Sequence, residues 1–396
     1  MPYSIRIALF IAFCALAGFA PQGHAILWSG NAPSAPSCPE SDGSAGATGD
    51  SAQYPTLLTG LFNVTYPATI KSQLGCLVAG VDYAVGLTSA QISALQDPTT
   101  AGLPSGCSYS SNKVTCSSNA TISGFDFSLH NGLQLVLSGA HTFIVTANKF
   151  GVGSNCLAPV VNSLGANTAS VTLTYNNVDG GGATCSSFSG GTVGMFNFGS
   201  AFGSGSTLVV SYNNFTNVPE DAIDMSGPSS GILTPTINNN VYHLQGWIGH
   251  PDGIQECAGN ITNLTIKFNT YITYYQGTQI SQPFHTEAQS PCTSSTADIE
   301  SAVTKFNTMV IAQSSTGTGS VCTGGSYPTN CGSNYAIACK QDAPGAPQNQ
   351  NNNYAAYGNY IDSRGALSAT TNDGCPSPTF GSPYHDVNMV TGANID

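Results

Sequence analysis

The sequence has few charged residues. Only 7% of its 396 residues are Asp, Glu, Lys or Arg, and eight basic residues stand against 20 acidic ones. Nucleic-acid-binding proteins need clustered Lys and Arg, so this composition argues against nucleic acid as a partner. It also disfavours a polyanionic substrate, unless a bound cation reverses the local charge. The composition therefore favours a neutral polymer, or an acidic polymer held through Ca²⁺.

Long hydrophobic runs are missing after residue 20. The apolar run 7–20 follows Arg6 and precedes Gly23-His24-Ala25, which is a pattern typical of a secretory signal and its cleavage site. We therefore expect a signal peptide at 1–25, with an uncleaved membrane anchor as the alternative. Loss of Arg6 with the signal would take the formal net charge from −12 to −13. The expected product is a secreted monomer, extracellular or periplasmic, without membrane contact.

The chain has no paired C-x-x-C spacing, although it contains 13 Cys. A Cys-ligated metal is therefore not supported. Cys14 lies in the expected signal, and the even number that remains predicts disulfides in an exported protein. The sequence neighbours Cys107 and Cys116, and likewise Cys322 and Cys331, are candidate pairs. Motifs for a nucleophilic serine, a dinucleotide or a P-loop are also missing.

Helical patterns are nearly missing as well. The best candidate is 87–95, with Thr88 or Ser89 as its N-cap and Pro98 beyond its end. After residue 110 the chain reads as short strands, without the intervening helices of a βαβ fold. A coil of strands needs its first open edge covered, and the helix is a candidate lid for that edge.

A short element recurs through these strands. Apolar and polar residues alternate, and then Asn, any residue and an apolar residue follow, as in the segment 143–150. The Asn positions are 148, 176, 213, 239, 269, 307 and 359. Steps of this size indicate a solenoid or a propeller, and their unequal lengths favour a coil with variable loops. We expect the Asn to adopt the left-handed conformation of a tight corner and to bond to the next Asn along the coil. The flanking apolar side chains would fill the interior.

These Asn corners, the small-residue loops and the secretion signal resemble the right-handed parallel β-helix proteins of the pectin-lyase-like superfamily. The resemblance covers about residues 110–370. It implies an all-β solenoid, here with a short N-terminal capping helix. The expected organisation is a leader and cap at 26–109, the β-helix at 110–370 and a tail at 371–396 that covers the last turn of the coil.

Three segments between residues 220 and 289 look like copies of one another. Laid in register, Asp221, Asp252 and Glu287 share one position, and His250 and His285 share another. Stacked strands lie about 4.8 Å apart, so carboxylates on adjacent strands would be close neighbours. Such a stack favours a carboxyl that keeps its proton as a general acid, or a bridging Ca²⁺. Because outward and core residues alternate along a strand, we also expect a bend at Ala222 or Gly253.

We therefore predict a secreted enzyme that cleaves a polysaccharide, as a hydrolase or as a lyase. The candidate catalytic residues are Asp221, Asp224, Asp252, Glu287, His250 and His285; Trp247, Gln255, Tyr274 and Tyr275 are candidates for substrate binding. Asp221, Asp252 and Glu287 would be the metal ligands of a Ca²⁺-dependent lyase. Structural capping by these Asp residues is the alternative. It would leave a non-catalytic glycan-binding or surface β-helix protein.

The resemblance supports only part of this site. Hydrolases of the superfamily use Asp residues on neighbouring turns of the coil, and Asp221, Asp224 and Asp252 are similar to that cluster. The accompanying His and Arg-Ile-Lys motifs are missing in that form. Lyases of the superfamily often use Arg or Lys as the base, but Arg364 is the only Arg after the signal, and Lys267 lies in a corner repeat.

Overall fold

The computed structural model describes most of the chain between residues 78 and 313, and short strands beyond. The described ranges are 78–80, 83–165, 167–185, 187–189, 194–198, 202–226, 233–244, 252–258, 260–274, 282–287, 298–299, 302–305, 307–313, 337–340, 354–357, 359–362 and 384–386. The expected signal and the Cys322–Cys331 pair lie outside these residues. No described helix is long and apolar enough to cross a membrane.

The fold is all-β, with three sheets whose strands pair almost entirely in parallel. The first sheet contains β1 (Cys107–Ser110), β2 (Lys113–Cys116), β4 (Gln134–Ser138), β7 (Val160–Ser163), β10 (Gly194–Phe198), β13 (Asp221–Ser226), β16 (Asp252–Ala258), β20 (Gln282–Glu287) and β24 (Ile337–Lys340). Among its described strands, the antiparallel pair is the hairpin β1–β2.

The second and third sheets have the same order along the chain. The second contains β3 (Ala120–Ser123), β5 (Thr142–Thr146), β8 (Ser170–Thr174), β11 (Ser206–Ser211), β14 (Leu233–Asn238), β18 (Leu264–Lys267), β22 (Ala302–Lys305) and β25 (Tyr354–Tyr357), with the short β17 (Asn260–Ile261) and β21 (Asp298–Ile299) beside them. The third contains β6 (Lys149–Gly151), β9 (Asn177–Asp179), β12 (Asn214–Val218), β15 (Val241–Leu244), β19 (Thr270–Tyr274), β23 (Thr308–Gln313), β26 (Asn359–Asp362) and β27 (Tyr384–Asp386).

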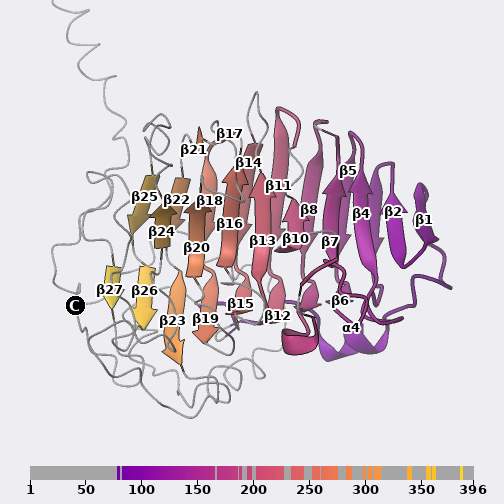
Figure 1. The fold of residues 1–396 in the computed structure, drawn as a ribbon, viewed down its shortest axis with the longest axis horizontal. Coiled ribbons are helices and arrows are strands. Elements are labelled where there is room, and N and C mark those ends of the chain that lie inside the picture. Colours follow the sequence, from indigo (N-terminus) through magenta and orange to yellow (C-terminus); the bar gives the residue numbers. More distant parts are fainter. Residues whose placement is uncertain are drawn as a thin grey trace, which may run out of the picture.

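From β4 to β26 the chain visits the three sheets in turn, and each strand pairs with the strand one cycle earlier. We call one such cycle a rung. Figure 1 shows the rungs side by side along the long axis, from β1 at one end to β27 at the other. This arrangement is compatible with the β-helix expected from the sequence. β27 pairs with β26 and lies in the segment that we expected to be a loop-like tail.

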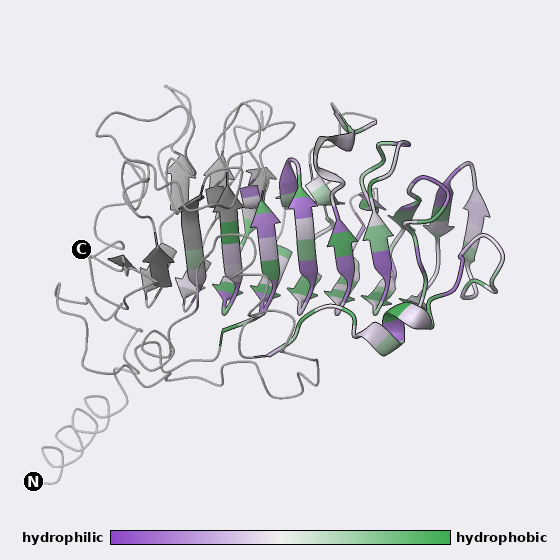
Figure 2. Cartoon of the chain, turned by 90° about the horizontal axis from the view of Figure 1, so that it is seen from below, coloured by the Kyte–Doolittle hydropathy of each residue, from purple (hydrophilic) through white to green (hydrophobic). Residues whose placement is uncertain are grey.

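The core lies between the sheets and follows the alternation of the strands. In β5, Phe143 and Val145 are fully buried, whereas Thr142 and Ile144 are exposed. Figure 2 shows the resulting bands of hydrophobic and hydrophilic residues along the strands. Aromatic rings also stack from rung to rung: the ring centroids of Tyr242 and Tyr271 are 4.7 Å apart, at an interplanar angle of 8°.

A ladder of buried Asn residues connects the rungs at the corner between the second and third sheets. Its members are Asn148, Asn176, Asn213, Asn240, Asn269 and Asn307. At each of the first five positions, the backbone N and Nδ2 both donate to Oδ1 of the next Asn. The predicted amide-to-amide bonding is therefore confirmed.

Two details of the predicted corner are wrong. Asn240, and not Asn239, occupies the ladder position in its rung. The left-handed conformation belongs to the residue before the ladder Asn, for example Tyr175 (φ 55°), Tyr212 (φ 58°) and Asn239 (φ 57°). The Asn is selected because its amide can both accept and donate inside the corner, and not because of its own backbone conformation.

The N-terminal segment 78–96 runs back across several rungs. The Ala79 carbonyl accepts a hydrogen bond from Thr270, and the Tyr83 hydroxyl donates to Asn239 Oδ1 over 2.6 Å. Farther along, Leu87 N donates to Asn177 Oδ1, and Gln96 N donates to the Gly124 carbonyl. This segment therefore connects rungs that are far apart in the sequence.

The predicted helix is present, but it is not the lid. Helix α4 (Ser89–Ser93) has Thr88 as its N-cap and a complete capping box with Gln91, yet none of its residues is buried. The core at the first rung is instead contacted by Ala101, Leu103 and Cys107 of the segment that follows. The apolar residues of the helix are too few to provide a buried face. The segment after the helix therefore covers the core at the first rung.

Two disulfides join described residues. Cys107–Cys116 was predicted and links β1 to β2. Cys156–Cys185 was not predicted, because its residues are 29 positions apart.

Candidate functional site

The predicted carboxylates lie on neighbouring strands of the first sheet. Asp221 and Asp224 belong to β13, and Asp252 belongs to β16. Asp224 pairs with Gln255 on one side and with Asn197 on the other. The predicted alignment of these two segments is therefore correct.

The third segment is placed differently from the prediction. In the pairing of β16 with β20, Asp252 lies opposite Gln282, and Gln255 lies opposite His285. Glu287 pairs with Lys340 instead of joining the position of Asp221 and Asp252. The apolar residues decide this register, since Ile254 pairs with Phe284. Our sequence alignment matched carboxylate to carboxylate, whereas the sheet matches apolar residue to apolar residue.

The result is two columns of polar positions. One column contains Asn197, Asp224, Gln255 and His285. The other contains Asp252 and Gln282. In the strand pair that precedes them, Asp221 lies opposite Gly194. Of the remaining predicted residues, Trp247, His250 and Tyr275 lie outside the described residues. For Tyr274, His285 and Glu287 the structure describes the strand but not the side chain.

The described polar side chains of these columns are almost completely buried. Their exposed fractions are 2% for Asp221, 4% for Asp224, 0% for Asp252 and 4% for Gln255. Asp252 N donates to Asp221 Oδ1 over 2.9 Å, and Asn197 Nδ2 donates to Asp224 Oδ2 over 3.0 Å. Asp224 Oδ1 has no hydrogen-bond partner among the described residues. A buried carboxylate oxygen without a donor is costly, which favours the protonated form.

The pKa values follow from this burial. Burial raises the pKa of Asp224 to about 7, and the hydrogen bond from Asn197 only partly opposes the effect. Burial, and next the negative charge of Asp252, raises the pKa of Asp221 well above its usual range. The site therefore contains a carboxyl group whose proton is exchangeable near neutral pH, beside other carboxyl groups.

The strand alternation breaks at Ala222, as the sequence suggested. Ala222 and Ile223 are both fully buried members of the core. Gly194, on the adjacent strand β10, lies against Asp224: a Cβ there would come within 2.7 Å of the Asp224 Cβ. A larger residue at this position would displace Asp224, so glycine permits the close approach of the two strands.

The sequence reasoning missed Asn197 and Gly194. Both belong to β10, one rung before the Asp residues. Asn197 precedes Asp224 by 27 residues, a step within the range of the Asn repeat, and this spacing was the available signal. The predicted site was based on acidic residues, and Asn197 is an amide.

No metal site of the predicted kind is found among the described side chains. They include no group of three or more His, Cys, Asp or Glu residues that could hold a metal ion. The predicted Ca²⁺ ligands would have been Asp221, Asp252 and Glu287, and the register separates Glu287 from the other two.

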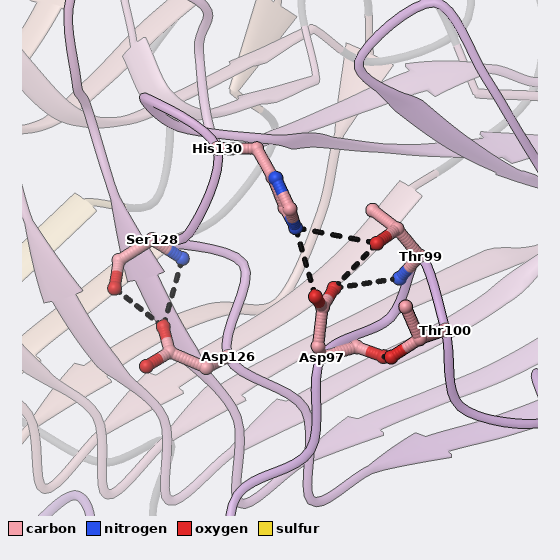
Figure 3. A network of polar contacts seen from close by, with 6 residues as sticks. All are labelled: Asp97, Thr99, Thr100, Asp126, Ser128 and His130. Carbon is pink, nitrogen blue, oxygen red and sulfur yellow. Dashed lines mark hydrogen bonds and ion pairs between the residues drawn. The ribbon is translucent and has the colours of Figure 1, made fainter.

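A second polar cluster lies near the first rung (Figure 3). His130 Nε2 is 2.9 Å from Asp97 Oδ2 and 3.2 Å from Thr99 Oγ1. Desolvation raises the pKa of Asp97, but hydrogen bonds from Thr99 and His130 outweigh it and leave the pKa below its usual value. Both contacts of His130 involve the same ring nitrogen, so the cluster lacks the relay geometry of a catalytic triad. It ties the segment after α4 to the loop at 128–132.

His243 in β15 is only 3% exposed, and burial lowers its pKa to about 3, so it is neutral at physiological pH. His243 is therefore not a proton carrier at neutral pH.

Comparison with known proteins identifies no relative. No family model matches the chain, and neither a curated protein nor a solved structure is significantly similar to it.

Proposed function

We propose that the fold is a right-handed parallel β-helix similar to those of the pectin-lyase-like superfamily. Three parallel sheets visited in turn and an Asn ladder at one corner support this proposal. Right-handed crossover between parallel strands is the strongly preferred hand. The disulfides and the N-terminal sequence support export to an oxidising compartment.

We further propose that the protein cleaves glycosidic bonds of a polysaccharide at the first sheet. The observation that carries this proposal is the protonatable Asp224, with its pKa of about 7, on the same strand as Asp221 and on the strand adjacent to that of Asp252. A carboxyl group that keeps its proton near neutral pH can act as a general acid. A second carboxyl can then serve as base or nucleophile.

Two pairs of these carboxyl groups would suit different outcomes. Asp221, whose pKa is also raised, and Asp252 are on adjacent strands, which are about 4.8 Å apart. This is near the separation typical of retaining glycosidases, and Asp221 would then replace Asp224 as the acid. Asp221 and Asp224 are three residues apart on one strand, or roughly 10 Å, which is nearer to the spacing of inverting enzymes. The stereochemistry of the product would distinguish these assignments.

Burial favours a second candidate function. The three Asp side chains have exposed fractions of at most 4%, so a substrate has little access to them as the site stands. In a non-catalytic surface or glycan-binding protein, the same carboxyl groups would only hold adjacent rungs together, as the bond from Asp252 N to Asp221 does.

The test is a screen of the purified protein against neutral and acidic polysaccharides, with and without Ca²⁺. Reducing ends and ultraviolet absorbance of unsaturated products are followed together. Reducing ends alone would indicate hydrolysis, and added absorbance would indicate elimination. Asp224→Asn should reduce the rate at least about a hundredfold if Asp224 is the general acid, and Asp252→Asn should also lose activity.

Asp179→Asn is the matched control, because Asp179 is an exposed carboxylate in the third sheet. It should keep full activity. Absence of products from folded protein on the whole panel, or full activity of Asp224→Asn, would reject the catalytic proposal in favour of the binding one.

A further inference from the structure

On five neighbouring strands of the second sheet, ten of the fourteen outward residues carry a hydroxyl group. In strands β5, β8, β11, β14 and β18, every second residue points away from the core. These residues are Thr142, Ile144, Thr146, Ser170, Thr172, Thr174, Thr207, Val209, Ser211, Thr234, Thr236, Asn238, Thr265 and Lys267. We call this set the hydroxyl face. Only Ile144, Val209, Asn238 and Lys267 lack a hydroxyl group.

The strand register arranges these residues as a two-dimensional grid. Thr142, Ser170, Thr207 and Thr234 form one column, and the other two columns run beside it in the same register. Neighbours within a column are about 4.8 Å apart, and neighbours along a strand are roughly 6.6 Å apart. The hydroxyl and methyl groups therefore repeat at nearly constant intervals in both directions.

The grid is also rigid. Thr, Val and Ile are restricted in χ1, so little side-chain entropy remains to be lost on binding. Lateral hydrogen bonds orient several hydroxyl groups: Ser170 and Thr207 are joined over 2.9 Å, and Thr174 donates to Thr146 over 3.0 Å. The Asn ladder follows the same strands at their ends and keeps successive rungs aligned, as side-chain ladders do in flat sheets.

The face is accessible to a partner. Ile144 is the middle outward residue of β5 and is 39% exposed. A large aliphatic side chain at this position contributes nothing to the core. A hollow of about 410 Å³ lies at the edge where the strands begin and is lined in part by Thr142, Ser170 and Thr207. The connecting loops therefore leave the first column open.

The chemistry of the face limits the choice of partner. It has no charged residue before Lys267, at its far end, so it offers nothing to a polyanion or to a cationic surface. It has no aromatic ring on which a sugar could stack. What it offers is a repeating set of small donors, acceptors and methyl groups, which suits an uncharged partner that is itself periodic.

We propose that the hydroxyl face binds ice. The repeats of the grid are of the same order as the spacing of water molecules in an ice surface. Threonine hydroxyl groups can take the place of lattice water, while the methyl groups exclude liquid water between them. A regular grid can make many such contacts at once, so each contact needs to contribute little. This inference is independent of the carboxylates on the first sheet.

The test uses the purified full-length chain with its disulfides formed. Ice recrystallisation and crystal shape are observed under the microscope over a range of protein concentrations. Wild-type protein should inhibit recrystallisation and facet the crystals. Thr172→Lys places a solvated charge in the centre of the face and should require at least about tenfold more protein for the same inhibition.

Thr216→Lys is the matched control, because Thr216 is also half-buried and central, but lies in the third sheet. It should inhibit as the wild type does, and circular dichroism should show both variants folded. Equal inhibition by Thr172→Lys, or none by folded wild-type protein, would overturn the proposal. Sedimentation with crystalline cellulose is measured in parallel. Binding that Thr172→Lys abolishes, without any effect on ice, would assign the face to a polysaccharide instead.

Discussion

The buried carboxyl groups are the most informative individual residues. Asp224 accepts one hydrogen bond from Asn197, and its other oxygen has no partner among the described residues. Asp221 is held by the backbone N of Asp252 and lies close enough to other acidic groups for its pKa to be raised by them. Both environments stabilise the protonated acid relative to the carboxylate.

This environment predicts an unusual dependence of stability on pH. The pKa of Asp224 is about 7 in the folded chain, against the ordinary 3.8. The folded state therefore holds more protons than the unfolded state between these values, and stability must fall as the pH rises from about 4 to about 7. The shift corresponds to roughly 4 kcal/mol in the free energy of unfolding.

Asp224→Asn should remove the contribution of Asp224 to this dependence, because the amide stays neutral at every pH, while the contribution of Asp221 remains. Its free energy of unfolding, measured by urea denaturation, should resemble that of the wild type near pH 4 and exceed it by a few kcal/mol near pH 8. Asp179→Asn is the control and should follow the wild type. An equally steep pH dependence in Asp224→Asn would show that this carboxyl is ionised in the folded chain.

At the scale of elements, the Asn ladder provides hydrogen bonds to backbone groups at the corners, which strand pairing alone cannot provide. Asn213 Oδ1 accepts from the N and Nδ2 of Asn176, and Asn213 Nδ2 donates to Asn240 Oδ1 and to the Leu173 carbonyl. These bonds satisfy backbone groups at a corner where the chain leaves one sheet for the next. The ladder thus makes the corner between the second and third sheets repeat from rung to rung.

Asn213→Ala should be strongly destabilising. It leaves Asn176 N and the Leu173 carbonyl buried without their present partners, and each such group costs about 1–3 kcal/mol. We expect a loss of about 2–6 kcal/mol in the free energy of unfolding, measured by urea denaturation at fixed pH. Asn238→Ala is the control, since Asn238 is half-buried on the outward face, and it should lose much less. Similar losses in both variants would contradict the role of the ladder.

Two local sequence patterns correctly predicted secondary-structure elements. Alternation of apolar and polar residues predicted the strands, and the capping pattern at Thr88 predicted α4. The place of Asn240 was missed because Asn238, Asn239 and Asn240 are consecutive and equally plausible as sequence. Only the contacts with Asn213 and Asn269 distinguish them.

For the whole molecule, the described disulfides are both near the N-terminal end of the stack. Cys107–Cys116 closes a loop between residues nine positions apart, and Cys156–Cys185 one between residues 29 positions apart. In a stack of rungs each rung contacts mainly its neighbours, so the effect of a cross-link is strongest locally. The long contacts of segment 78–96 then connect this end to later rungs.

Removal of the longer cross-link should therefore cost more. Chain-entropy reasoning gives a difference of about 1 kcal/mol between the two loops. Cys156→Ala with Cys185→Ala should thus lower the thermal midpoint more than Cys107→Ala with Cys116→Ala, as measured by calorimetry. Hydrogen exchange should show the greatest loss of protection in the first rungs. The opposite order of midpoints would indicate that packing near β1 and β2 dominates.

The sequence by itself determined the all-β class, the repeating corners, a short helix within 87–95 and the placement of Asp221, Asp224 and Asp252 on adjacent strands. These features depend on local periodicity and on spacing between similar segments, which the chain displays directly. Tertiary structure alone decided the register of β20, the partnership of Asn197 with Asp224 and the burial that raises the pKa of that carboxyl. It also placed the hydroxyl groups of distant strands in one grid. The reason is that connecting segments differ in length, so the pairing of one strand with the next is settled by apolar packing across rungs and not by distance along the chain.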